Sequence, residues 1–437
     1  PVPRPTERAT GNNTSINMPL AMPIATPSSM AALHSSLDRT VTGCAAYDEI
    51  AAPRQRLTLD IIRDHRGFER LQTEWDTLLQ SNQRNQLAFQ SHGWIQSWLR
   101  SYACDHDKAP VMAIITARTN GHLRVICPLA VNQVFGLTCL TWLGEPASQL
   151  GDVLTDGTQA SHDLVAQVLD HAIASLQPDL LHLRKVRHDA AIRPWLDASQ
   201  ACATGHNEAP FLDFRNAEST ADYCAKYTAK ARKNRRRLRR RLEESGQIST
   251  TVLQTGEAAR EAIHIGLAFK QAWLIERGHI SSVLRDTHMP EFLADYVSHP
   301  NRIATPFVSI MRSGDTPVSV QFGVVAQRRL ALHMIAYNPE TEKSGAGVLH
   351  IEDTIAHCID NGLTELDFLA PDAPYKRAWA DAAVPVSDYV ITRTVRGQLY
   401  ARGYLSHTRD LLKSRIATLP LGLRQTIARQ IQAHASP

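Results

Sequence analysis

The sequence has few cysteines and none of the short motifs that would assign a metal or nucleotide site. Its seven cysteines are scattered without a CxxC pair, which predicts reduced thiols and a cytoplasmic location rather than a disulfide framework. It has no HExxH segment and no Cys/His cluster with zinc spacing, so we expect chemistry without a metal. GxGxxG and the GK[ST] ending of a Walker loop are also missing, which argues against the usual dinucleotide and triphosphate sites.

Long hydrophobic runs are missing as well. No stretch of about 18 apolar residues occurs, so we expect no membrane span. The chain has 437 residues, of which 43% are hydrophobic, and a formal net charge of +4; this length allows two or three domains of ordinary size. Residues 1–53 are rich in Pro, Ser, Thr, Ala and Asn, and we expect them to form a disordered leader.

The stretch from residue 331 to residue 379 carries the clearest pattern. It reads as a strand, a loop of small residues, a helix with apolar positions at helical spacing, and a second strand. In chain order these parts are residues 331–337, then Ser344, Gly345, Ala346 and Gly347, then residues 348–359, and finally residues 364–369. The first turn of a helix leaves backbone N–H groups unpaired, and glycines let a phosphate approach them. The alternative is that Ser344 is an N-cap and the glycines form an ordinary turn.

Further sequence features resemble a known family. Tyr337-Asn338-Pro339, the small-residue loop and the segment LDFLAPDAPYKRAW resemble the C-terminal half of the GNAT-like acetyltransferases called CelD/BcsL, also described as BioF2-like and related to the FemAB aminoacyl-transferases. The family loop more often reads Ser-Pro-Gly. The segment matches the family pattern of an acidic residue at a strand end followed by Tyr-Lys-Arg-x-Trp, here Asp367, Tyr375, Lys376, Arg377 and Trp379.

The resemblance extends over residues 57–396 and implies an α/β fold. It predicts two tandem GNAT-like (acyl-CoA N-acyltransferase) domains with mixed sheets after the leader. The expected divisions are the leader (1–53), an N-terminal GNAT-like domain (54–200), a C-terminal BioF2-like domain (201–400) and a basic helical tail (401–437). Within them we expect a polar linker at 201–208, one charged helix over 221–242 and a turn at Arg396-Gly397.

The resemblance also implies an activity. An acyltransferase of this kind moves an acetyl or longer acyl group from acetyl-CoA or another acyl-CoA to an amine or hydroxyl, by direct attack in a ternary complex. The backbone of residues 334–337 would line the thioester, Ser344 to Gly347 would hold the pyrophosphate, and Asp367 or His333 would handle the proton. The family's association with exopolysaccharide and envelope synthesis makes a sugar precursor the expected acceptor, with envelope or polysaccharide-synthesis proteins as further partners.

Each candidate side chain also has a structural interpretation. Asp367 could be a base raised in pKa by burial, or could pair with Lys376 or Arg377. His333 could be a general base, or a satisfied histidine on an apolar strand. Tyr375 could protonate a departing thiolate, or pack against Trp379. Lys376 and Arg377 fit phosphate binding, or simple surface exposure.

The basic run from Lys230 to Arg241 leaves alternatives open. It could be a solvated or ion-paired helix face, a contact for acyl-CoA phosphates, or a nucleic-acid surface. No aromatic residue is interleaved beyond Tyr227, so we do not expect nucleic-acid binding, except tRNA if the chain transfers an aminoacyl group as FemAB relatives do. A catalytically degenerate binding subunit of an envelope complex is a third hypothesis.

Overall fold

The protein is described here by a computed structural model. The structure describes residues 56–82, 88–102, 110–279, 286–299, 303–408, 411, 414–416 and 418–433. All of these residues belong to one compact unit, Gln55–Pro437. The predicted disordered leader, residues 1–53, lies outside the described residues.

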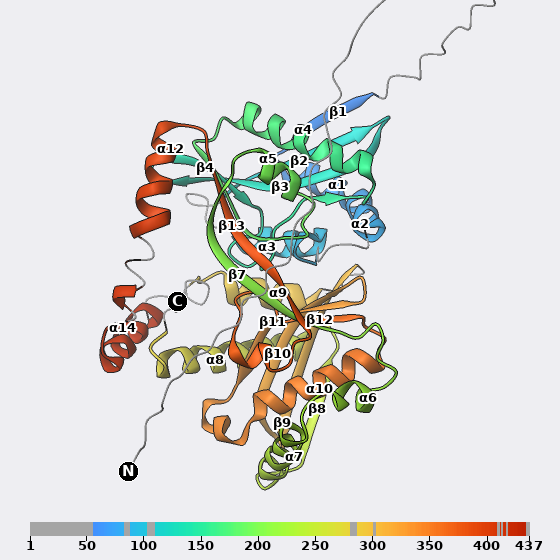
Figure 1. Cartoon of the computed structure of the whole chain (residues 1–437), viewed down its shortest axis with the longest axis vertical. Coiled ribbons are helices and arrows are strands. Elements are labelled where there is room, and N and C mark those ends of the chain that lie inside the picture. Colours follow the sequence, from blue (N-terminus) through green and yellow to red (C-terminus); the bar gives the residue numbers. More distant parts are fainter. Residues whose placement is uncertain are drawn as a thin grey trace, which may run out of the picture. The chain divides into compact units, whose positions relative to one another are not determined.

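The first half of this unit begins with a strand and three α-helices, continues with an antiparallel meander and a long helix, and ends with a strand, a short helix and a last strand (Figure 1). Its elements are β1 (Leu57–Ile62), α1 (His65–Arg70), α2 (Gln72–Ser81), η1 (Ala88–Gln90), α3 (His92–Tyr102), β2 (Val111–Thr119), β3 (His122–Val134), β4 (Leu137–Trp142), β5 (Leu154–Thr155), α4 (Gln159–Leu176), β6 (Leu180–Arg187), α5 (Arg193–Ala198) and β7 (Cys202–Asp213).

The second half repeats this order of strand, helices, meander, helix and strand, preceded by two helices. Its elements are α6 (Thr220–Ala225), α7 (Ala229–Glu243), β8 (Ile248–Leu253), α8 (Glu257–Glu276), α9 (Met289–Ser298), β9 (Ala304–Ser313), β10 (Thr316–Ala326), β11 (Arg329–Tyr337), η3 (Pro339–Ser344), α10 (Ala346–Asp360), β12 (Glu365–Asp367), α11 (Pro374–Arg377) and β13 (Ala382–Thr392). After it follow α12 (Val395–Tyr400), η4 (Ala401–Thr408) and α14 (Leu421–Ala433).

A single sheet runs through both halves, in the order β1-β2-β3-β4-β6-β13-β7-β12-β11-β10-β9-β8. Neighbours are antiparallel except β4 with β6 and β11 with β12, which are parallel. The last strands of the halves are exchanged: β7 pairs with β12 of the second half, and β13 pairs with β6 of the first. Figure 1 shows β7 and β13 side by side. The fold is therefore mixed α/β with two similar halves, as predicted.

Helices cover both faces of the sheet. On one face the largest core joins α1–α3 of the first half to α8 and α9 of the second, and Trp75, Trp94 and Phe292 are among its fully buried members. On the other face α4 packs on the first half, and α10 with α6 packs on the second. The tryptophans of the first helices are thus core residues.

Three local predictions were wrong. Residues 201–208 are not a linker but the start of β7, because β13 supplies backbone partners that override their polarity. The charged run divides into α6 and α7, since Thr228 caps a new helix by accepting from the Ala231 amide (3.2 Å). Arg396-Gly397 lies inside α12, because Thr394 caps that helix in the same way through the Gly397 amide (3.1 Å).

Among the helices of the described part of the chain, none combines the length and the apolar character needed to cross a membrane.

Acid should destabilise the protein through its buried histidines. His350 lies between the hydroxyls of Ser309 and Ser319, each 2.8 Å from a ring nitrogen, and burial lowers its pKa from 6.5 to about 3. The folded state keeps this ring neutral, while the unfolded chain binds a proton below about pH 6.5, so stability is lost as the pH falls from 6.5 towards 3. We expect the free energy of unfolding to fall by at least about 2 kcal/mol between pH 6.5 and 4.5, measured by urea denaturation. His350→Gln should flatten this slope, and an unchanged slope would contradict the assignment.

Candidate active site

The two strands on either side of the predicted loop part from one another. β11 and β12 pair only at Arg329, Leu330 and Ala331, opposite residues 365–367. β12 then ends, and the Phe368 amide turns to Pro210 O (2.9 Å), whereas β11 continues to Tyr337. The register of β10 against β11 also shifts beside His333, which has no Cα partner there. The edge of β11 beyond Ala331 is therefore open on the β12 side.

A first cavity of about 320 Å³ lies at this opened edge, beneath the N-terminus of α10. Its lining is mainly apolar and comes from α8, β11, the small-residue loop and the segment after β12. The lining residues are Phe269, Lys270, Trp273, Ile335, Ala336, Tyr337, Glu342, Gly345, Gly347, Val348, Ile351, Tyr375 and Trp379. The Glu342 carboxylate is paired with Arg277 and accepts from the Tyr337 hydroxyl (3.2 Å).

The small residues build the entrance to this cavity. Gly345 has a left-handed backbone (φ +74°) and precedes α10, and no side chain caps that helix. The Gly345 amide donates to Glu342 O (3.0 Å) and the Val348 amide to Gly345 O (3.0 Å). The first-turn amides of Ala346 and Gly347 therefore remain available to an anion, which the helix dipole also favours. Ala346 points instead into the core and is 1% exposed. Ser344 ends η3 and is not the N-cap, a role that Gly345 takes.

The equivalent helix of the first half has a side-chain cap at its N-terminus. α4 follows β4 and β5 as α10 follows β11, but Thr158 caps it by accepting from the Ser161 amide (3.3 Å). An internal cap satisfies a first-turn amide that an anion would otherwise bind. Of these two helices, α4 has a side-chain N-cap and α10 does not.

A second cavity of about 350 Å³ adjoins the first and shares Lys270, Ile335 and Tyr375 with it. Its wall is formed by α8, α9, β11 and the segment between β12 and α11. The lining residues are Gln149, Leu267, Lys270, Leu274, Met289, Leu293, Leu332, His333, Met334, Ile335, Phe368, Leu369, Ala370, Pro371, Ala373, Tyr375 and Lys376. Two ligands bound in the two cavities would thus meet at the shared residues.

His333 lines the second cavity and is held by the first half of the chain. Its Nε2 lies 2.9 Å from Ala147 O and 3.3 Å from the Gln149 amide nitrogen. Because a carbonyl oxygen can only accept, Nε2 carries the hydrogen and Nδ1 the lone pair. Burial lowers the pKa of His333 to about 4, and the charge of Lys185 adds to this. The ring is therefore neutral at pH 7.

The three side chains of the Tyr-Lys-Arg segment lie in different environments. Tyr375 lines both cavities, and burial raises its pKa to about 12. Lys376 is buried, and its ammonium donates to Leu369 O (2.8 Å) and Pro371 O (2.7 Å). Arg377 is exposed and pairs with Asp372 and Glu208, and it lines neither cavity. Of the two alternatives for this pair, surface exposure holds for Arg377 but not for Lys376.

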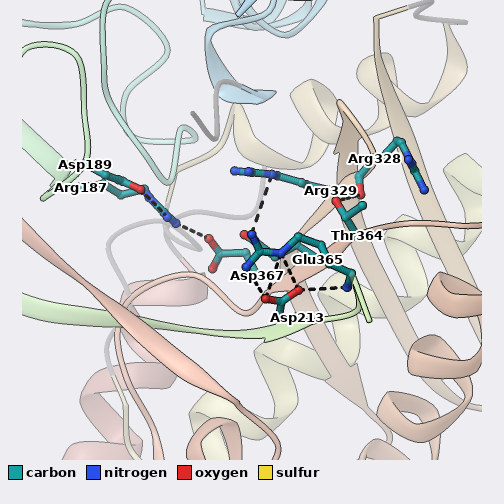
Figure 2. Close-up of polar contacts among 9 residues, drawn as sticks. Arg187, Asp189, Asp213, Arg328, Arg329, Thr364, Glu365 and Asp367 are labelled. Atoms are coloured by element: carbon teal, nitrogen blue, oxygen red, sulfur yellow. Dashed lines mark hydrogen bonds and ion pairs between the residues drawn. The ribbon is translucent and has the colours of Figure 1, made fainter. Parts of the chain in front are cut away.

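Asp367 is fully buried and belongs to an ion-pair network rather than to a cavity wall (Figure 2). Its Oδ2 accepts from Arg187 (2.8 Å), and its Oδ1 accepts from the Leu369 amide (2.6 Å). Arg187 in turn donates to both oxygens of Asp189 (2.9 and 3.0 Å). Burial raises the pKa of Asp367, and the guanidinium and the amide oppose that shift. Its partner is therefore Arg187, not Lys376 or Arg377.

Sequence reasoning missed Lys270, Gln149 and Arg187. Lys270 stands one turn before Trp273 on α8, and that pairing of cation and aromatic residue was a weak local signal. Gln149 and Arg187 come from the first half, and Arg187 is 180 positions from its partner Asp367. No local pattern shows such a contact. Among the described residues, no group of three or more His, Cys, Asp and Glu side chains is placed to hold a metal.

Comparisons with known proteins find several solved structures and one family profile. Among solved structures, FemX aligns with a TM-score of 0.50 and 10% identity, over 76% of this chain and 98% of that one. The C-terminal domain of a putative lysylphosphatidylglycerol synthetase from Agrobacterium fabrum aligns at 0.46 and 11%, over 77% and 95%. A tandem GNAT protein from the clavulanic acid biosynthesis pathway aligns at 0.42 and 12%, over 77% and 98%. No curated protein sequence matches the chain.

The fold consists of two halves with the same order of elements, and its likeness to FemX extends over 76% of the chain. Residues 229–377 match the family profile described as "Acetyltransferase (GNAT) domain". This range contains the opened strand pair, the α10 entrance and most of the walls of both cavities. The chain therefore carries a GNAT acyltransferase domain and is an enzyme of that kind.

Proposed function

We propose that the protein transfers an acetyl or longer acyl group from acyl-CoA to an amine or hydroxyl of a cell-envelope or exopolysaccharide sugar precursor. The observation that carries this proposal is the pair of adjoining cavities at the separated ends of β11 and β12, one of which lies at the uncapped α10 entrance. The donor would occupy the first cavity and the acceptor the second. Binding both side by side supplies much of the rate acceleration of a direct transfer.

In this proposal the amides of Ala346 and Gly347 hold the donor pyrophosphate, because the Gly345 amide already donates to Glu342 O (3.0 Å). The Ala346 side chain anchors the loop in the core, and Ser344 ends the turn that leads into it. The thioester carbonyl lies along the open edge of β11 at residues 334–337, where backbone N–H groups stabilise the oxyanion that forms. Lys376 fixes the segment after β12, whereas Arg377 contributes to the donor site only if its pairs with Asp372 and Glu208 open.

Proton transfer would be shared between His333 and Tyr375. His333 is neutral and offers the Nδ1 lone pair, so it suits the base that accepts the acceptor's proton. Tyr375 lies where the cavities meet and keeps its proton throughout the neutral range, so it suits the acid that protonates the departing thiolate. Asp367, with both oxygens occupied, would act by positioning the segment after β12 rather than by taking the proton.

Tyr375→Phe tests this division of roles. The variant should lose about 100-fold in kcat, because general acid catalysis contributes roughly that much, with little change in the KM for the acyl-CoA. Steady-state release of the CoA thiol measures both. Tyr400→Phe, outside both cavities, serves as the control. A kcat within threefold of the wild type would remove Tyr375 from the mechanism.

The donor itself is tested by screening acetyl-CoA and longer acyl-CoAs for thiol release with and without amino-sugar acceptors. Turnover of at least one of them is expected; no binding or turnover of any would contradict the proposal and favour a degenerate binding subunit. The specific rival is aminoacyl transfer from tRNA, favoured by the FemX-like fold and by the exposed cations of α7, such as Lys233, Arg236 and Arg240. Nuclease-sensitive RNA co-purifying with the chain would support that rival. Cytoplasmic location and envelope-synthesis partners belong to the same proposal.

A further inference from the structure

The second cavity has positively charged groups in its wall and no carboxylate. Lys270 from α8 and Lys376 from α11 both line it, and the other polar side chains of the wall are those of Gln149, His333 and Tyr375. The rest of the lining is apolar, with Leu274 and Phe368 among it. A half-buried cation without a partner is costly, because desolvation disfavours the charged form. This cavity is therefore predisposed to bind an anion.

Of the two lysines in this wall, Lys270 is the one without a hydrogen-bonded or acidic partner among the described residues. Among the described residues its ammonium contacts only an aromatic ring, that of Trp273, with 4.9 Å to the centroid. No acidic side chain of the described part of the chain pairs with it, and burial lowers its pKa. Its position at the junction of the cavities places the charge next to the reacting groups.

Lys376 adds to the positive charge rather than cancelling it. Its ammonium has two bonds to carbonyl oxygens, which leaves a third N–H for a ligand. The nearest carboxylates are already occupied, Asp367 by Arg187 and Asp372 by Arg377. Burial lowers the pKa of Lys376 to about 8, and the charge of Lys270 contributes to that shift. The two ammonium groups are thus close enough to interact.

We propose that the acyl acceptor is itself an anion, with a phosphate or carboxylate group held by Lys270 and assisted by Lys376. This inference rests on the proposed function, since it takes the second cavity as the acceptor site. The anionic oxygens supply the missing partner for Lys270, and the apolar wall receives the uncharged part of the molecule. A neutral acceptor would leave the Lys270 charge half-buried and unpaired, and would bind less tightly.

The test is calorimetric titration of three amino sugars into the full chain in the presence of CoA. Glucosamine is neutral apart from its amine, glucosamine 6-phosphate adds a phosphate, and muramic acid adds a carboxylate. At least one of the two anionic sugars should bind ten or more times more tightly than glucosamine, and the tighter of them identifies the group that is recognised. Lys270→Met should abolish the preference, whereas Lys233→Met, on the exposed face of α7, should keep it.

The outcomes separate this inference from the proposed function. Equal binding of all three sugars, no binding of any, or a preference that survives Lys270→Met would overturn the anionic acceptor. CoA is titrated first in each sample, so a failure of the proposed function appears separately as absent CoA binding. Thermal unfolding of K270M should be close to that of the wild type, because Lys270 has no acidic partner and its ammonium loses only the contact with the Trp273 ring. If K270M is destabilised, K270Q provides the same binding comparison.

Discussion

Gly347→Asp should weaken acyl-CoA binding by about 100-fold while leaving the protein folded. Gly347 is the second residue of α10 and lines the first cavity, so an aspartate there would place its charge against the donor phosphates. Two like charges about 5 Å apart repel by about 3 kcal/mol at an effective dielectric constant of about 20. The same carboxylate favours the helix itself, because negative charge at a helix N-terminus is stabilising. Calorimetric titration of acetyl-CoA measures the affinity.

Gly347→Ala is the matched control for this substitution. Both variants add a Cβ that would lie 3.0 Å from Cδ1 of Tyr337, so both shift that ring by the same small amount. The alanine adds no charge, and we expect its affinity to stay within about fivefold of the wild type. Equal losses in the two variants would mean that crowding of Tyr337 matters and that phosphates do not bind at the start of α10.

Arg187→Met should lower the free energy of unfolding by about 3–5 kcal/mol, because it leaves the buried Asp367 carboxylate without its partner. Urea denaturation monitored by tryptophan fluorescence gives the difference. Arg187 also pairs with Asp189, but that carboxylate is 48% exposed, so water can replace the lost ion pair at little cost in stability. The large cost therefore arises from the contact that joins β6 of the first half to β12 of the second.

The double variant Arg187→Met with Asp367→Asn provides the control. Removing the charge of Asp367 should recover at least about 1 kcal/mol of the loss, since the residues interact directly. Asp367→Asn alone should retain kcat within about tenfold if Asp367 positions the segment after β12. A folded Asp367→Asn variant with a loss of 1,000-fold or more would instead make this carboxylate the base.

Most of the second half could be predicted from the sequence because its signals are local. The helical spacing from Val348 and the apolar strand before it each depend on neighbouring residues, and α10 and β11 form where expected. The division of the charged run 221–242 into two helices was harder to predict, because it depends on the Thr228 cap, which helix propensity alone does not reveal. Residues 201–208 became a strand for a reason that lies in β13, far along the chain.

The site was predictable only as far as it is built from one segment. The loop residues and Tyr375 come from residues 344–375 and do line the cavities, apart from Ser344 and Ala346. Gln149, Lys270 and Arg187 belong to other elements and reach the site by tertiary packing. The role of Asp367 depends on Arg187, so its sequence position at a strand end could not distinguish a base from a buried ion-pair partner.

Hydrogen–deuterium exchange with and without acetyl-CoA tests the central assignment most directly. The account predicts slower exchange of the amides at residues 345–351 of the α10 entrance and at residues 332–337 of β11 when acetyl-CoA is present. Amides around residues 158–162, at the capped start of α4, should not change. Protection at α4 with none at α10, or no protection at either helix, would contradict the placement of the donor.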